Sequence, residues 1–170
     1  MTPVSTPIPR RNRPRPLTTQ GMPHAQVNVR PVPEIHAELF RRAYQLPGVR
    51  NEPTRISVPG ARALWLEENL QLAHGELILV GREFAHIHPD GSLHVTLEPQ
   101  RAVEAIEQGW AEYHPLARQL GIDGMVLIYT PLDEHELEVV FQLILDSYNY
   151  ITGQNLEPAA IPAAEMNGGK

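Results

Sequence analysis

The strongest constraint on the fold is a β-hairpin signal in the segment Gly81–Leu97, which reads GREFAHIHPDGSLHVTL. Its centre, Pro89-Asp90-Gly91, has the residues of a tight turn: proline presets φ, aspartate can bond its own backbone, and glycine accepts a left-handed conformation. The runs on both sides alternate apolar and polar residues, as strands with one buried face do. The sequence therefore predicts a hairpin in which His86 lies opposite His94.

This register divides the hairpin side chains between two faces, because successive strand residues point to opposite sides. The aliphatic residues share one face, which we expect to be part of the core. The other face is expected to carry Phe84, His86, His88, Ser92, His94 and Thr96. Directly opposed residues have Cβ atoms roughly 5 Å apart, so the three imidazoles can converge on one small ligand or ion. The pattern predicts a functional site on this face.

Several separated sequence motifs, in the order in which they occur in the chain, resemble the luciferase-domain family. The characterised members of this family are the fungal luciferases of the hispidin pathway. The motifs are the hairpin, EAIEQGWAEYHPLA and MVLIYTPLDEHELEVVFQLILDSYNYITG, within about residues 60–153. The matching positions are Arg82, Glu83, Ala85, His86, His88, Leu93, His94, Gly109, Trp110, His114, Pro115, Leu116, Ala117, Tyr129, Pro131 and Glu134. The resemblance implies oxygen addition to a 3-hydroxy-α-pyrone, decarboxylation of the peroxide and light emission. Two departures, a shorter hairpin loop and the expected lack of a hydrophobic N-terminal anchor, limit what carries over from the fungal enzymes. We expect a bacterial-type member of the family.

Composition limits the remaining possibilities. The 170 residues include no cysteine, which excludes disulfides, thiolate metal sites and a cysteine nucleophile.

Residues 1–33 contain five arginines and eight prolines but no acidic residue, and we expect a flexible, solvated arm that the fold does not need. We expect a single domain at residues 34–153 and a flexible tail at residues 154–170.

The expected fold class is α+β. An antiparallel sheet built on the central histidine-rich hairpin is packed on one face by helices, which we expect near residues 33–46 and 131–151. Further strands are expected at Arg55–Val58, Ala61–Leu66 and Leu77–Val80 before the hairpin, and at Met125–Thr130 after it.

The segment Trp110–Leu116 is expected to be a loop that follows a helix end. If this loop folds over the histidine face, His114 becomes a fourth imidazole of the site and Trp110 a stacking wall. In the alternative, Trp110 closes the core and His114 bonds a carbonyl.

Three interpretations of the histidine face remain open. The imidazoles bind a divalent metal, act without metal as a general base and hydrogen-bond donors, or only line the surface of a binding protein. The favoured function is oxygen-dependent, luciferase-like oxidation of a small enol or α-pyrone, and the alternative is a small-molecule or metal-binding protein without turnover.

The residues expected to carry this function fall into three groups. The expected catalytic residues are His86, His88, His94, His114 and Arg82. The expected substrate-binding residues are Phe84, Thr96, Trp110 and Tyr113, and the candidate metal ligands are His86, His88 and His94.

The expected co-substrate is molecular oxygen, with a divalent metal as an open possibility and no other cofactor assigned. The expected partner is a small molecule, with no nucleic acid and no membrane, in a cytoplasmic protein that can form a homo-oligomer.

Overall fold

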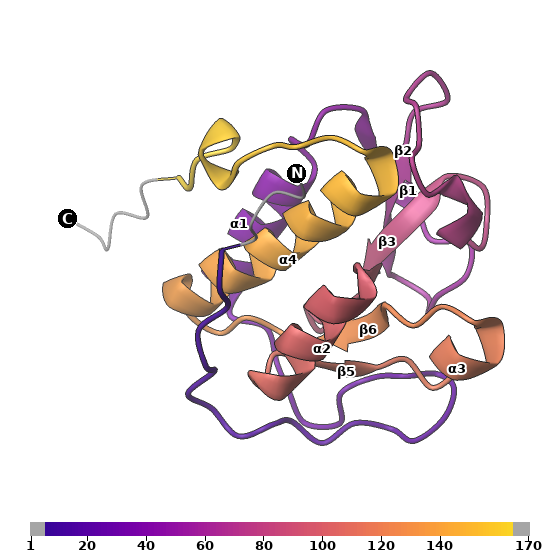
Figure 1. Cartoon of the computed structure of the whole chain (residues 1–170). Coiled ribbons are helices and arrows are strands. Elements are labelled where there is room, and N and C mark those ends of the chain that lie inside the picture. Colours follow the sequence, from indigo (N-terminus) through magenta and orange to yellow (C-terminus); the bar gives the residue numbers. More distant parts are fainter. Residues whose placement is uncertain (1–5, 165–170) are drawn as a thin grey trace.

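Six strands form one antiparallel sheet in the order β1-β2-β3-β4-β6-β5 (Figure 1). The structure is a computed structural model and describes residues 6–164. The strands are β1 (Val49–Pro53), β2 (Arg62–Leu66), β3 (Glu83–Ile87), β4 (Leu93–Thr96), β5 (Ala111–Tyr113) and β6 (Met125–Ile128). The helices are α1 (Pro33–Ala43), α2 (Pro99–Glu107), α3 (Ala117–Leu120) and α4 (Glu134–Thr152), with 3-10 turns η1 (Gly75–Leu77) and η2 (Pro158–Ala160). This arrangement confirms the α+β class.

The β3–β4 hairpin has the predicted register, with His86 opposite His94. The turn is closed by the His88 amide, which donates to the Ser92 carbonyl at 2.8 Å, and by the Gly91 amide, which donates to the His88 carbonyl at 2.9 Å. Gly91 has a φ of 88°, and a Cβ there would lie 2.9 Å from Thr130 Cγ2. The turn therefore needs glycine for both its conformation and its space.

The core lies between the sheet and the helices. Helix α4 crosses one face of the sheet, and its N-terminus is capped by Asp133, whose side chain accepts from the Glu136 amide at 2.8 Å. Leu93 and Val95 of β4 and Phe141 and Ile144 of α4 are nearly or fully buried in this layer. None of the helices within residues 6–164 is long and apolar enough to cross a bilayer.

A β-bulge interrupts the alternation of β3. Leu64 of β2 is opposite Ala85, but its neighbour Trp65 is opposite Glu83, so Phe84 has no partner on β2. Phe84 therefore joins Ala85 on the core side, where its ring meets the ring of Tyr148 at 6.1 Å between centroids. The prediction that Phe84 faces the histidines is wrong, because the bulge turns Glu83 to that face instead.

The N-terminal arm packs on the body, in contrast to the solvated arm that we expected. Ile8 is 5% exposed in the core, and Trp110 Nε1 donates to the Pro9 carbonyl at 2.6 Å. Farther along, Gln26 Nε2 donates to Thr130 Oγ1 at 2.7 Å. In Figure 1 the indigo segment runs beside β5, where Arg15 donates to the Ala111 carbonyl at 3.1 Å.

The C-terminal segment also contacts the body where it is described. Arg42 of α1 donates through Nη2 to the Ile161 carbonyl at 3.0 Å, and Ile161 is buried. Residues 1–5 and 165–170, which belong to the predicted arm and tail, lie outside the described residues.

Three expected local structures differ from those observed. Residues 55–58 and 77–80 are not strands, and the first strand of the sheet is instead β1. The expected loop at residues 110–116 contains β5, which forms the sheet edge beside β6.

The packing of the arm gives a stability prediction. Changing Ile8 to Ala is expected to lower the free energy of unfolding by about 2 kcal/mol, since a buried aliphatic side chain is removed. The loss corresponds to a melting temperature roughly 4–8 °C lower for a chain of this size. The change is measured by calorimetry or by circular dichroism during heating.

Leu17 is the matched control, because it lies in the same arm but is 71% exposed. Changing Leu17 to Ala is expected to alter stability by less than about 0.5 kcal/mol. Equal, negligible effects of the two variants would mean that the arm does not pack in solution.

Candidate functional site

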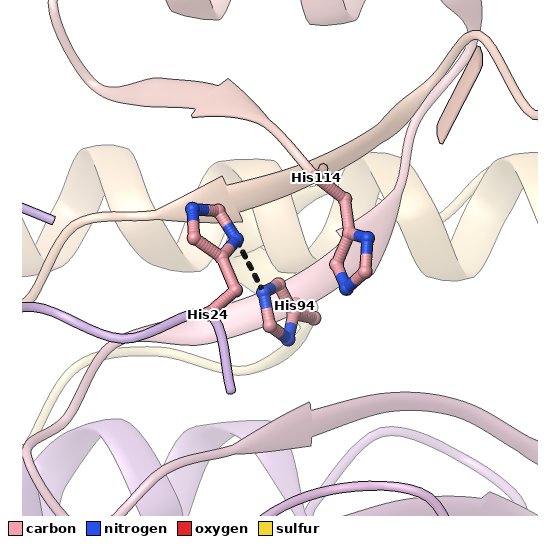
Figure 2. Close-up of side chains that lie close together, drawn as sticks. All are labelled: His24, His94 and His114. Carbon is pink, nitrogen blue, oxygen red and sulfur yellow. Dashed lines mark hydrogen bonds between the residues drawn. The ribbon is translucent and has the colours of Figure 1, made fainter. Parts of the chain in front are cut away.

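Five histidines converge on the sheet face opposite α4. His86 comes from β3 and His94 from β4, His88 begins the hairpin turn, His114 follows β5, and His24 comes from the N-terminal arm. The ring of His94 is central: its centroid lies 4.7–5.2 Å from those of the other four rings. Figure 2 shows His24 bonded to His94, with His114 beside them.

These histidines border a cavity of about 450 Å³. The rest of its wall is mainly apolar and comes from the arm, from the segments between β1 and β2 and between β2 and β3, from α3 with the residue before it, and from the start of β6. The wall residues other than histidine are Met22, Pro23, Ile56, Ser57, Val58, Leu79, Leu116, Leu120 and Met125. The site therefore combines a polar cluster of imidazoles with an apolar wall, as small-molecule sites usually do.

Short contacts between ring nitrogens and carboxylate oxygens join three of the rings into a chain that ends at two carboxylates. His86 Nδ1 lies 3.0 Å from Glu83 Oε2, and His86 Nε2 lies 2.9 Å from His94 Nδ1. His94 Nε2 lies 3.1 Å from His24 Nδ1, and His24 Nε2 lies 2.9 Å from Glu112 Oε2. Each of these three rings therefore has a close polar neighbour at both of its nitrogens.

The remaining two rings are held by other groups. His88 Nδ1 lies 2.9 Å from Ser92 Oγ, and that hydroxyl lies 2.6 Å from Asp90 Oδ1. The His114 ring accepts a hydrogen bond at Nδ1 from the Leu116 amide at 3.1 Å. The turn at Pro89-Asp90-Gly91 thus fixes a side chain of the site as well as the register.

Burial and crowding make several rings neutral. Desolvation, and then repulsion from the neighbouring imidazoles, lowers the pKa of His88 to about 4 and the pKa of His114 to about 4. The same two causes lower the pKa of His94. These three rings are uncharged at pH 7 and keep a nitrogen lone pair, the form in which an imidazole accepts a proton or binds a metal.

Glu83 is ionised in spite of its burial. Desolvation alone would raise its pKa, but hydrogen bonds from His86, the Arg55 amide and Thr54 Oγ1 lower it below the usual range. This carboxylate reaches the site only because of the bulge at Phe84.

Arg82 lies away from the cavity. Its guanidinium donates to the carbonyls of Leu66, Glu67 and Leu70 at 3.2, 2.7 and 2.6 Å. These bonds fasten the segment between β2 and β3, so the structure offers no geometry in which Arg82 faces a substrate anion in this cavity.

The four predicted substrate-binding residues are dispersed. Phe84 and Trp110 are in the core, and Trp110 is 1% exposed. Tyr113 is on the sheet edge, 47% exposed, on the side of β5 opposite Glu112. Thr96 shares the histidine face, where it lines a smaller pocket with His86 and His94. Phe84 also borders this pocket, although its ring packs in the core.

Sequence reasoning did not identify His24, Glu83 and Glu112 as parts of the site. His24 is 70 residues from His94 in the chain, in a segment without periodicity. Glu112 follows the alternation of β5, a segment for which the sequence predicts a loop. For His24 the sequence alone contains no signal.

The family model for the Luciferase domain matches residues 81–146. This chain is 32% identical over 177 aligned residues to a luciferase of Armillaria gallica, covering 92% of this chain and 65% of that protein. It is 32% identical to a luciferase of Armillaria ostoyae and 31% identical to one of Armillaria mellea, covering 85% of this chain and 61% of each relative. The chain thus spans less than two thirds of these relatives.

No solved structure matches the chain significantly. The relatives described above are fungal, and the comparisons give no support for a bacterial-type member. The matched segment contains the hairpin with its three histidines, as well as His114 and Glu112. Through residues 81–146, the chain belongs to the luciferase-domain family.

Proposed function

We propose that this protein catalyses a luciferase-like, oxygen-dependent oxidation of a small enol or α-pyrone, of the 3-hydroxyhispidin type, in the cavity beside His94. Family membership supports a luciferase-like function in general. The observation that carries the specific proposal is the convergence of five imidazoles on one apolar-walled cavity.

The cavity is suited to a small aromatic or conjugated substrate. Its volume of about 450 Å³ falls within the usual range for small-molecule sites. Apolar side chains such as Ile56, Val58 and Leu120 line the cavity together with the imidazoles. A substrate bound there would place its polar end against the histidines and displace water from them.

The imidazole cluster fits the chemistry that such an oxidation requires. An enol must lose its proton before it reacts with oxygen, and neutral imidazole nitrogens promote this loss either by taking the proton or by holding a cation beside the enol oxygen. Oxygen then adds to the ionised pyrone and carbon dioxide leaves. Oxygen supplies the oxidising equivalents, so the reaction needs no further oxidant or reductant.

His114 is suited to hold the ionised substrate. Because its Nδ1 accepts from the Leu116 amide, the neutral ring carries its proton on Nε2. An N–H group on the cavity wall can donate to the enolate oxygen, and such bonds to a charged group contribute about 1.5–3 kcal/mol.

The first functional prediction is oxygen uptake. With 3-hydroxyhispidin and air, the protein is expected to consume oxygen faster than the substrate does alone, measured with an oxygen electrode, with emission recorded in parallel. Changing His94 to Ala is expected to lower the rate by at least about 100-fold, because the central imidazole is lost. Changing His114 to Gln is expected to lower it by about 10–100-fold.

His74 provides the matched control, since its side chain is 39% exposed and bonds Glu76 away from the cavity. Changing His74 to Gln is expected to leave the rate within about twofold. A folded wild type that binds the pyrone without taking up oxygen would favour the alternative function, a small-molecule-binding protein without turnover.

A second prediction concerns Arg82, whose three carbonyl contacts indicate a structural role. Changing Arg82 to Gln is expected to lower the melting temperature by roughly 4–8 °C, since the carbonyls of Leu66, Glu67 and Leu70 lose a charged donor. The KM for the pyrone is expected to stay within about twofold. A raised KM at unchanged stability would place Arg82 at the substrate instead.

A further inference from the structure

We propose that His86, His88 and His94 form a binding site for one divalent transition-metal ion, through His86 Nε2, His88 Nε2 and His94 Nδ1. One nitrogen of each ring lies within 4.8 Å of those of the other two. All three residues are buried, and all three line the cavity. The inference goes beyond the proposed function, because it depends on hydrogen bonds around the rings and not on the substrate.

The tautomer of His86 follows from its contact with Glu83. A carboxylate only accepts, so His86 Nδ1 carries the proton that bonds Glu83 Oε2. The tautomer with its proton on Nδ1 has its lone pair on Nε2, on the side of His94. Metal-binding histidines commonly have this carboxylate partner, which fixes the ring and makes the free nitrogen a stronger ligand.

The tautomer of His88 is set by the hairpin turn. The Ser92 hydroxyl has one proton, which it donates to Asp90 Oδ1 at 2.6 Å. It must therefore accept from His88, whose Nδ1 lies 2.9 Å away. This leaves the lone pair of the neutral ring on His88 Nε2.

The tautomer of His94 is set from the N-terminal arm. His24 Nε2 donates to Glu112 Oε2, and the tautomer with its proton on Nε2 has its lone pair on Nδ1. That lone pair accepts from His94 Nε2 at 3.1 Å (Figure 2). The lone pair of His94 is consequently on Nδ1, facing His86.

Three lone pairs thus meet without a donor between them. His86 Nε2 and His94 Nδ1 lie 2.9 Å apart, a distance at which two lone pairs repel unless a cation lies beside both. A proton would join only these two nitrogens and leave His88 Nε2 without a partner. A metal ion can be coordinated by all three nitrogens. Two ligand atoms that each lie about 2.0–2.1 Å from an ion, at an angle of about 90°, are roughly 2.9 Å apart, which matches the distance between His86 Nε2 and His94 Nδ1.

The second histidine triad, His24, His94 and His114, is less suitable although its nitrogens also lie within 4.8 Å. His114 Nδ1 accepts from the Leu116 amide, so the neutral ring is protonated on Nε2. It has no second lone pair for an ion. In this arrangement His24 is a positioning residue and His114 a wall residue.

Charge and ligand type indicate the class of metal. The carboxylates of Glu83, Asp90 and Glu112 surround the triad and compensate a dication, though none of them occupies a position among the three nitrogens. Three imidazoles suit zinc, iron, copper or nickel, whereas calcium and magnesium prefer oxygen ligands. Three protein ligands would leave coordination positions open for a small molecule.

The test measures metal binding by the full chain after removal of any affinity tag. Protein stripped with a chelator is titrated with Zn²⁺ by calorimetry and with Co²⁺ by visible absorption, and metal content is checked by mass spectrometry. We expect one ion per chain. The melting temperature is expected to rise by roughly 5–10 °C when free metal exceeds the Kd about 100-fold.

Single variants identify the ligands. Changing His88 to Gln is expected to abolish stoichiometric binding, whereas the matched change of His114 to Gln leaves the Kd within about threefold. Changing Glu112 to Gln or His24 to Gln is expected to weaken binding about 10–100-fold, because the outer hydrogen bonds are lost. Metal-free melting temperatures of all four variants show whether each is folded.

Two results would overturn the inference. One is a folded wild type that binds neither ion, and the other is binding that is lost with His114 but kept with His88. Oxygen uptake by stripped and reloaded protein is measured separately from metal binding. A protein that binds the metal but takes up no oxygen would contradict only the proposed oxidation, and one that takes up oxygen but binds no metal would contradict only the metal site.

Discussion

The pairing of β3 with β4 is the constraint on which the rest of the structure depends. One register places Ile87, Leu93 and Val95 in the core and the imidazoles of His86 and His94 side by side on the other face. Because strand side chains alternate, a shift by one residue would exchange the two faces. Packing of the aliphatic face against α4 therefore also maintains the arrangement of the imidazoles.

The two faces of the sheet are covered in different ways. On the core face, α4 supplies a regular apolar layer. On the histidine face, the cover consists of the arm, the segment between β1 and β2, and the short helix α3. Irregular segments can leave a cavity where regular packing would fill it, and functional residues are often presented on such segments above a rigid scaffold. A regular helix on one face and irregular segments on the other together explain how a small chain holds polar side chains in a largely apolar cavity.

Local patterns in the sequence were enough to predict the hairpin, its register and the three clustered histidines, because turn chemistry and alternation act over a few residues. The bulge could not be predicted, since it depends on how β2 pairs with β3. It exchanges Phe84 for Glu83 at the site. The burial of Trp110 and the contact of His24 with His94 depend equally on long-range packing, which an arginine- and proline-rich segment does not reveal.

The contacts of His24 also have a consequence for the order of folding. His24 is separated by 70 residues from His94 and by 88 from Glu112, yet it bonds both. During synthesis, the arm leaves the ribosome long before its partners, so these contacts close a very long loop. The hairpin can form from neighbouring residues within microseconds. The arm is thus among the last segments to reach its place, and the cavity gains its complete wall only after nearly the whole sheet has assembled.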